Sequence, residues 1–336
     1  MHDFLKKSFL FLIFFLPWQL ALNLGIGIDL ASGRVLIALL FLAWLAFQLL
    51  RKKVSMPSDF VSISLYGFIF CMLFSIVFSR EIEWSLRKAS FLLSIFPIIF
   101  LTEYFLEGKD RREIILKVLV TSSFGVAFLG IIQFFSQFLF GWEAVYFFWA
   151  DYISAPFLGR AFSEAVLQNP SWLVEISGRT WIRATAVFPD PHMLSFFLNL
   201  SIGANLALII KNKKILFWRI SLAVLVLASL LTFSRGGYVG FFLASLVISV
   251  IFFMKLRVPQ KIRLTGILLG ITIVLAAISP IRERFFSSFN LREGSNIGRL
   301  ETWGKAWDVW ERNFPLGVGI GSYPLFVKAT ADYREP

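Results

Sequence analysis

The sequence predicts an all-α, polytopic integral membrane protein, and three observations carry this prediction. Long apolar stretches separated mostly by short basic loops fill residues 8–279, and a polar, tryptophan-rich stretch follows at 280–336. The chain is 57% hydrophobic and 16% charged, so a soluble domain of this length could not bury its apolar surface. Lipid accepts such stretches as helices, because every backbone N–H and C=O must be paired within the span.

Nine stretches are long and apolar enough to cross a bilayer. We place these spans at residues 8–28, 33–50, 59–78, 89–106, 114–139, 191–210, 215–233, 238–254 and 264–279. Lys6 and Lys7 precede the first span and no small-x-small cleavage site follows it, so we expect a retained signal anchor. Residues 1–279 would then form a transmembrane helical domain, and residues 280–336 the first part of a large extracytoplasmic loop.

The distribution of basic residues predicts the orientation of the spans. A net charge of +12 would suggest a nucleic-acid partner in a soluble protein. Here the dense Lys/Arg clusters occupy every second short loop, which is typical of loops that stay in the cytoplasm. We therefore expect no nucleic-acid partner, a cytoplasmic N-terminus and an extracytoplasmic 280–336. The exception is REIEWSLRK at 80–88, which carries three basic residues in an expected outer loop.

Two large segments fall on the outer side in this arrangement. Residues 140–190 contain many aromatics, which favours re-entrant or interface-lying structure over a free hydrated loop. Within 280–336, apolar residues recur at spacings of three and four and predict an amphipathic helix at about 299–314. These residues are Leu300, Trp303, Trp307, Trp310 and Phe314. The helix would lie in the outer interface, or it would form part of a small extracytoplasmic core.

Three outer arginines stand in distinctive settings: Arg183 before the sixth span, Arg235 in LLTFSRGGYVG, and Arg299 at the head of the amphipathic helix. Arginine is permanently charged and presents a planar fork of donors suited to phosphate oxygens. The glycines after Arg235 let backbones approach closely, so this arginine could be presented between packed helices. The alternatives are a plain helix break and arginines that merely reach lipid headgroups.

Other candidate groups are fewer. Asp190 and His192 are outer residues able to take a proton, although His192 also suits a helix start. One cysteine and two histidines, with no metal-ligand spacing, predict neither a disulfide nor metal catalysis, and we expect no cofactor. GVGIGS at 317–322 looks like a phosphate-binding glycine loop but lacks a preceding strand and GK[ST], so we interpret it as a turn-rich loop.

At these residues the chain resembles the O-antigen ligase and polymerase superfamily of bacterial envelope membrane proteins. The resemblance is carried by RATAVFPDPHMLSFFLNL, by LLTFSRGGYVGFFLASL and by GRLETWGKAWDVWERNFPLGVGIGSY, together with the order of the spans. It covers most of the chain from about residue 120 onward. The third block is the most specific, because it has the family's order of an arginine, a tryptophan, an alanine and then P-x-G-x-G.

The resemblance implies a helical fold of about twelve spans whose large outer loop caps the active site. It implies transfer of a glycan from undecaprenyl diphosphate to an acceptor hydroxyl, of the lipid A core or of another lipid-linked repeat unit, at the outer face of the bacterial inner membrane. No nucleotide or metal is needed. Arg183 and Arg235 match the arginines that hold the diphosphate, and we assign them as catalytic candidates. Arg299, His192, Asp190 and Trp303 become substrate-binding candidates.

The chain departs from the family pattern at two places. The family often has an Asn-Pro-Asn-like stretch where this chain has PDPHM. A His-Asn pair, whose histidine is expected to activate the acceptor, normally follows the glycine block, and this chain ends at Pro336, about where that pair would begin. We therefore expect a chain truncated at its C-terminus, with part of the catalytic loop missing.

Three other functions remain open from the sequence. A flippase or transporter of the same lipid-linked sugars would be expected to carry charges within its spans, and these spans are nearly free of charge. Membrane glycosyltransferases that use polyprenyl phosphates usually have an acidic pair in the first outer loop, where this chain offers Asp29. A purely structural membrane protein is the third alternative.

Overall fold

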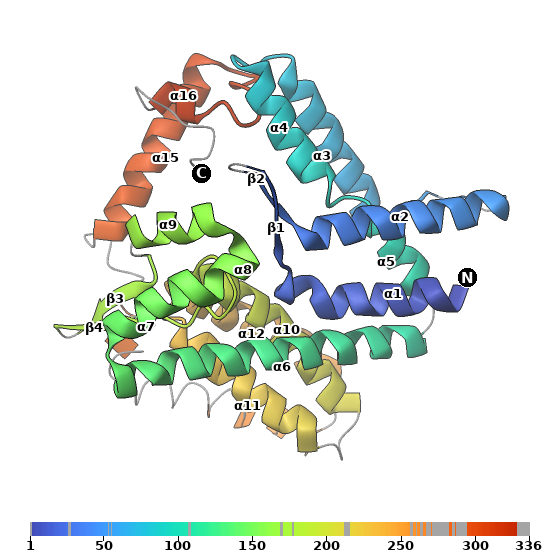
Figure 1. Ribbon diagram of the computed structural model, residues 1–336. Coiled ribbons are helices and arrows are strands. Elements are labelled where there is room, and N and C mark those ends of the chain that lie inside the picture. The colour runs from blue at the N-terminus through green and yellow to red at the C-terminus, as the bar shows by residue number, and fades with distance from the viewer. Residues whose placement is uncertain are drawn as a thin grey trace. The chain divides into compact units, whose positions relative to one another are not determined.

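The fold is mostly helical, with two small antiparallel hairpins, in a computed structural model of the chain (Figure 1). The structure describes residues 2–25, 28–52, 54, 56–106, 109–168, 171–176, 178–211, 216–255, 258–259, 261–262, 265–266, 270, 282–283, 286 and 294–327. The chain forms two compact units. The first unit comprises residues 1–9, 34–109 and 291–336, and the second comprises residues 10–33 and 110–290.

The first unit is built from helices. It holds the start of α1 (His2–Phe15), most of α2 (Ser32–Leu50), α3 (Phe60–Ile76), α4 (Ile82–Leu93), α5 (Ile98–Leu106), α15 (Gly294–Arg312) and α16 (Pro324–Val327). Asp59 caps α3 by accepting hydrogen bonds from the backbone N–H groups of Val61 and Ser62. Aromatic rings fill the helix contacts; the centroids of Phe9 and Phe105, for example, lie 4.7 Å apart.

The second unit combines long helices with short elements. In chain order these are the 3-10 turn Leu16–Trp18, β1 (Ala21–Gly25), β2 (Ile28–Ala31), α6 (Lys109–Phe140), α7 (Trp142–Phe148), the π-helix Trp149–Ser154, α8 (Ala155–Leu158), α9 (Arg160–Gln168), β3 (Leu173–Ile176), β4 (Arg179–Ile182), α10 (Pro191–Lys211), α11 (Leu216–Leu231) and α12 (Arg235–Lys255). The strands form two hairpins, β1–β2 and β3–β4.

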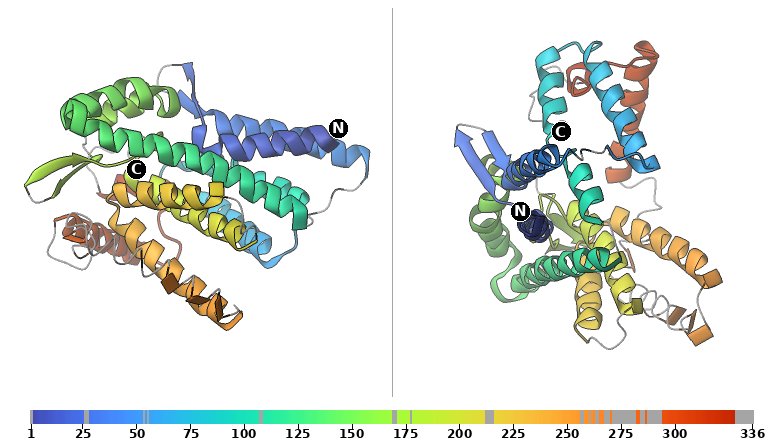
Figure 2. Two further views of the ribbon diagram at one scale, coloured as in Figure 1. Left: turned by 90° about the horizontal axis from the view of Figure 1, so that it is seen from below. Right: turned by 90° about the vertical axis from the view of Figure 1, so that its right-hand side faces the viewer.

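Long helices build the core of the second unit. α6 runs along α10 and α11 (Figures 1 and 2), and the hydroxyls of Ser123 and Ser201 are 2.8 Å apart across the α6–α10 contact. Small polar residues at such contacts let membrane helices approach closely and hydrogen-bond. The core continues through α10, α11 and the segment after β4, where buried side chains include Leu194, Leu225 and Val187 respectively.

Four of the described helical stretches are long and apolar enough to cross a membrane: Ser32–Leu50, Ile82–Leu106, Asp110–Phe140 and Pro191–Lys211. Three shorter apolar helices are Phe60–Ile76, Leu216–Leu231 and Arg235–Val247. The ninth expected span, 264–279, lies outside the described residues apart from isolated positions. A membrane protein is thus indicated, and the number of nine spans stays a prediction.

Two expected elements are wrong in detail. The sequence predicts one span over 8–28, whereas α1 ends at Phe15 and the hairpin β1–β2 follows. Pro17 explains this end, because proline lacks the helical N–H and clashes with the preceding turn. The loop expected at 80–88 is largely helical, since α4 begins at Ile82, and Arg87 pairs with Glu83 one turn away. The hairpins also correct the expected all-α fold to a mostly helical one.

The glycine loop 317–322 docks on the turn between α3 and α4. Three serine side chains hold it: the hydroxyls of Ser79 and Ser322 are 2.6 Å apart, and Ser85 donates to the carbonyl of Ile320. Gly319 has φ +82°, and a Cβ there would lie 2.6 Å from Cα of Ser79. The glycines therefore serve a close backbone contact, in agreement with a turn-rich loop (Figure 1).

Candidate functional site

The segment that carries Arg183 is held in place by two glutamines of α6. The amide oxygen of Gln133 accepts hydrogen bonds from the backbone N–H groups of Thr185 and Ala186, each at 2.8 Å. The amide oxygen of Gln137 accepts from the backbone N–H of Ile182 at 3.0 Å. Both glutamines are buried. Because buried backbone groups need partners, these bonds fix the path of the chain from β4 into α10.

Arg183 is buried and joins this segment to the C-terminal end of α11. Its Nε donates to the carbonyl of Thr232 at 2.8 Å, Nη2 to that of Phe233 at 3.4 Å, and Nη1 to that of Ser171 at 3.1 Å. A cation at the carbonyl end of a helix is favoured by the helix dipole. Three of its five N–H donors are thus directed at backbone carbonyls, and Arg183 positions the turn 232–235.

Asp190 begins α10. Its Oδ1 accepts hydrogen bonds from the backbone N–H groups of His192 at 2.6 Å and Met193 at 2.9 Å. This is the geometry of an N-cap, in which a carboxylate satisfies N–H groups that have no partner within the helix. The structure therefore gives Asp190 a capping role.

Ser234 lies directly before α12 and also contacts α10. Its buried hydroxyl oxygen accepts a hydrogen bond from the backbone N–H of Gly237 at 3.0 Å, and it lies 2.7 Å from Nδ1 of His192. His192 is the second residue of α10, so this contact joins the N-termini of two helices. Such termini carry partial positive charge and attract anions.

Gly237 permits the close approach of α12 to α10. A Cβ at this position would lie 1.9 Å from Oγ of Ser195 and 2.8 Å from its Cβ, and because the Cβ cannot rotate away, a side chain here would displace α10. The amide of Asn199 donates to the carbonyl of Gly237 at 2.9 Å and strengthens the contact. A Cβ on Gly236 would come only within 3.5 Å of the Phe196 ring, an ordinary contact. The expected close approach beside Arg235 is present, and Gly237 provides it.

Arg235 is the first residue of α12 and is 6% exposed. Arg235 follows Ser234 directly. The carbonyls of Thr232 and Phe233, which accept hydrogen bonds from Arg183, belong to the two residues before Ser234. The turn 232–235 thus brings Arg183, His192 and Arg235 into one region of the second unit. Asp190 belongs to the same region through the α10 cap.

Two residues in this region adopt left-handed backbone conformations without being glycine. Ala186 has φ +52° and Phe233 has φ +47°. Such conformations cost about 1–3 kcal/mol each and persist where surrounding contacts impose them. Gln133 holds the first, and Arg183 binds the carbonyl of the second. Ala186 is three residues after Arg183, and Phe233 accepts a hydrogen bond from it, so both strained residues lie close to Arg183. Such a concentration of backbone strain is typical of a functional region.

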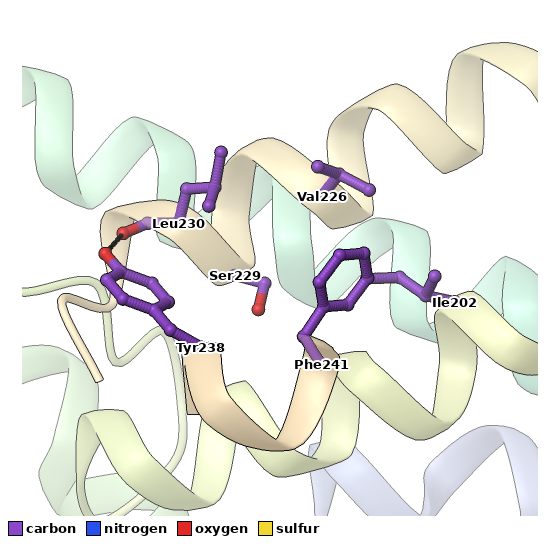
Figure 3. Close-up of a pocket in the computed structure, with 6 residues that line it drawn as sticks. All are labelled: Ile202, Val226, Ser229, Leu230, Tyr238 and Phe241. Atoms are coloured by element: carbon purple, nitrogen blue, oxygen red, sulfur yellow. Dashed lines mark hydrogen bonds between the residues drawn. The ribbon is translucent and has the colours of Figure 1, made fainter. Parts of the chain in front are cut away.

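A small pocket lies between α10, α11 and α12 (Figure 3). It is lined by Ile202, Val226, Ser229, Leu230, Tyr238 and Phe241. Its volume open to a water-sized sphere is about 10 Å³, about what one water molecule needs. Mainly apolar side chains surround it, and Tyr238 donates its hydroxyl to the Leu230 carbonyl. This pocket is too small and too apolar for a sugar or a diphosphate.

Arg299 and Trp303 lie on α15 of the first unit. Both side chains are exposed, and Trp303 is 67% exposed. Of the apolar stripe predicted at 299–314, α15 carries Leu300, Trp303, Trp307 and Trp310, whereas Phe314 follows the end of the helix at Arg312. The ring centroids of Trp307 and Trp310 lie 4.9 Å apart. Arg183, Asp190, His192 and Arg235 share the second unit, and Arg299 and Trp303 belong to the other.

Sequence reasoning missed Gln133, Gln137 and Ser234. The two glutamines did carry a signal, since they stand four residues apart in the apolar stretch IIQFFSQFLF. Polar residues inside a span face the protein interior and are commonly functional. Ser234 had no comparable signal, because its contact with His192 joins residues 42 positions apart.

Among the described residues, no group of three or more His, Cys, Asp and Glu side chains is placed to hold a metal ion. The expectation of chemistry without a metal stays a prediction.

Comparison with known proteins gave one family. Residues 220–336 match the family model described as O-Antigen ligase, a region that begins within α11 and contains Ser234, Arg235, α12 and α15. Neither the curated proteins nor the solved structures that were compared with the chain gave a match.

Proposed function

We propose that the chain belongs to the O-antigen ligase superfamily, which the match over residues 220–336 supports, and that it transfers a glycan from undecaprenyl diphosphate to an acceptor hydroxyl. Membership indicates a membrane enzyme of the glycosyltransferase kind that acts in surface polysaccharide biosynthesis, with lipid-linked glycans and membrane lipid as partners. The apolar helices agree with a location in the bacterial inner membrane. The acceptor is the lipid A core or another lipid-linked repeat unit.

One observation supports the proposal most strongly: the N-termini of α10 and α12 meet through His192 and Ser234, and the buried Arg235 begins α12. The diphosphate that leaves in this reaction carries negative charge, and fixed positive groups lower the energy of the transition state in which that charge develops. Two helix N-termini and an arginine together favour a diphosphate over a neutral ligand.

The roles of the two arginines then differ. Arg235 is the candidate for direct contact with the diphosphate. Arg183 donates to three backbone carbonyls, so we propose that it acts mainly by holding the turn 232–235 in the geometry that presents Arg235. Asp190 acts by capping α10.

The first unit supplies the second part of the proposal. The contact between the hydroxyls of Ser79 and Ser322 favours a location of the α3–α4 turn and of α15 on the same side of the membrane, which we propose is the outer side. The exposed tryptophan stripe of α15 would then lie among the outer headgroups, where tryptophan is enriched. Arg299 and Trp303 would bind the lipid-linked substrate from there.

The test is transfer by the purified protein in liposomes, with a lipid-linked glycan donor and an acceptor. We expect Arg235→Ala to lower transfer by two orders of magnitude or more, about 3 kcal/mol of lost transition-state stabilisation. Arg179→Ala is the matched control, because Arg179 is an exposed arginine of the same unit. Full transfer by Arg235→Ala would contradict the assignment. Flipping of the donor without formation of a new glycosidic bond would favour the flippase alternative.

A further inference from the structure

We infer that Ser234 fixes the tautomer of His192, so that the imidazole is neutral and carries its proton on Nε2. The ring would then donate an N–H to a phosphate oxygen of the lipid-linked substrate, and Ser234 would be a positioning residue. The identity of this ligand rests on the proposed function. The tautomer does not, because it follows from the two hydrogen bonds of the Ser234 hydroxyl.

The hydrogen bonds of Ser234 set the direction of its contact with His192. The hydroxyl group has one proton to donate and two lone pairs. One lone pair receives the backbone N–H of Gly237 at 3.0 Å. Ser234 is 0% exposed, and within the described residues the other partner of its hydroxyl oxygen is Nδ1 of His192 at 2.7 Å. The hydroxyl proton of a buried serine needs an acceptor, and Nδ1 provides one.

The opposite arrangement is less favourable. If Nδ1 carried a proton, the Ser234 oxygen would accept two hydrogen bonds, from Gly237 and from His192. Its own buried proton would then lack an acceptor among the described residues. A hydrogen bond donated by the Ser234 hydroxyl to Nδ1 of His192 satisfies the Gly237 N–H, the hydroxyl proton and Nδ1, and it leaves the proton of the ring on Nε2.

This tautomer determines what His192 does in the proposed reaction. With Nδ1 occupied by Ser234 and a proton on Nε2, the ring does not accept a proton from the acceptor hydroxyl. It can donate an N–H to an oxygen that becomes more negative as the glycan leaves the diphosphate. The proton stays on Nε2 throughout, and the general base of the reaction is another group.

The direct test is ¹⁵N NMR of the imidazole. The chain has two histidines, His2 and His192, so His2→Gln leaves a single ring in protein labelled with ¹⁵N-histidine. We expect an unprotonated Nδ1 and a protonated Nε2 at neutral pH. A proton on Nδ1, or on both nitrogens, would overturn the inference whatever the enzyme's activity.

Variants of Ser234 separate positioning from folding. Ser234→Thr keeps both the hydroxyl and the cap of α12, and we expect it to keep the Nε2-protonated tautomer. Ser234→Ala removes both, and we expect exchange between the two tautomers in protein that still binds the membrane. An unchanged single tautomer in Ser234→Ala would show that Ser234 does not set it. If Ser234→Ala fails to fold, the wild-type spectrum alone still decides the tautomer.

Substitutions of His192 test the donor role. Glutamine places an amide N–H near the position of Nε2, whereas leucine offers no donor. We expect His192→Leu to lower transfer by about tenfold to a hundredfold, the range for a lost hydrogen bond to a charged group, and His192→Gln to lose markedly less. Equal losses would contradict the donor role. If the wild-type protein transfers no glycan, the proposed function fails while the NMR result stands.

Discussion

The docking of the glycine loop gives a prediction with a matched control inside the loop. Gly319→Ala places a Cβ 2.6 Å from Cα of Ser79 and 3.0 Å from the carbonyl oxygen of Ser75. Gly317→Ala adds a Cβ with no described atom within 4 Å. Both glycines have positive φ, +70° at Gly317 and +82° at Gly319. The two variants therefore share the backbone cost and differ in the contact.

The magnitudes separate the variants clearly. An alanine in the left-handed region costs about 1–2 kcal/mol, which applies to both. Gly319→Ala must also move the backbone of Ser79, and overpacking of this kind costs about 1–3 kcal/mol. The Ser79–Ser322 and Ser85–Ile320 hydrogen bonds, about 1 kcal/mol each, favour the docked loop equally in both variants and so do not change the difference. We expect Gly319→Ala to favour the undocked loop by about 2 kcal/mol more than Gly317→Ala.

Disulfide cross-linking measures this docking. Cys71 is exposed and is first changed to serine, and cysteines then replace Ser79 and Ser322. Their hydroxyls are 2.6 Å apart, close enough for cysteines at these positions to react. We expect rapid cross-linking in the parent and in Gly317→Ala, and slow cross-linking in Gly319→Ala. Equal rates in both variants would refute the close contact at Gly319.

Three further predictions concern the second unit. Gly237→Ala should destabilise the protein by about 1–3 kcal/mol in thermal unfolding because of the clash with α10, and Gly236→Ala should be near neutral; equal effects would contradict the close approach. Asp190→Ser should keep the N-cap and near-normal transfer, whereas Asp190→Ala should lose about 1 kcal/mol of stability. Loss of transfer in Asp190→Ser would indicate that the reaction needs the carboxylate itself. Asn205 is fully buried with no partner for either amide atom among the described residues, so Asn205→Leu should raise stability by about 1–3 kcal/mol, and a fall would indicate a bound water or ligand there.

Helices of the second unit followed well from the sequence. The expected spans 114–139, 191–210 and 215–233 correspond to α6, α10 and α11 within a few residues. Their uninterrupted apolar content leaves no other structure that pairs the backbone in lipid. The prediction of the first span was wrong. It relied on the length of the apolar stretch and gave too little importance to Pro17, which determines where α1 ends.

The hairpin β3–β4 was hidden by its aromatic surroundings. The residues SWLVEISGRTWI alternate in character around Ser-Gly, and Gly178 has φ +72°. This alternation is the signature of a turn between two strands, but the high aromatic content of 140–190 favoured an interfacial interpretation.

Candidate site residues could be named from the sequence more readily than their roles. Arg183 was identified as an outer arginine, yet two of its three carbonyl partners, those of Thr232 and Phe233, are about fifty residues away. Contacts over such distances depend on how α6, α10 and α11 pack, which local patterns do not encode. Asp190 was a candidate for substrate binding, and the hydrogen bonds of its carboxylate show that it also caps α10.

The hydrogen bonds between the side chains of Gln133 and Gln137 and the backbone of residues 182–186 have a consequence for biosynthesis. Both glutamines belong to α6, and the backbone groups they bind are 45 to 53 residues further along the chain. At a translation rate of about 5–20 residues per second, those partners emerge several seconds after α6. During that interval the side-chain amides of Gln133 and Gln137 must form hydrogen bonds with water or with the insertion machinery, because unpaired amides are costly in lipid. The segment that carries Arg183 therefore completes α6 as a stable span, and the functional region assembles in the same step.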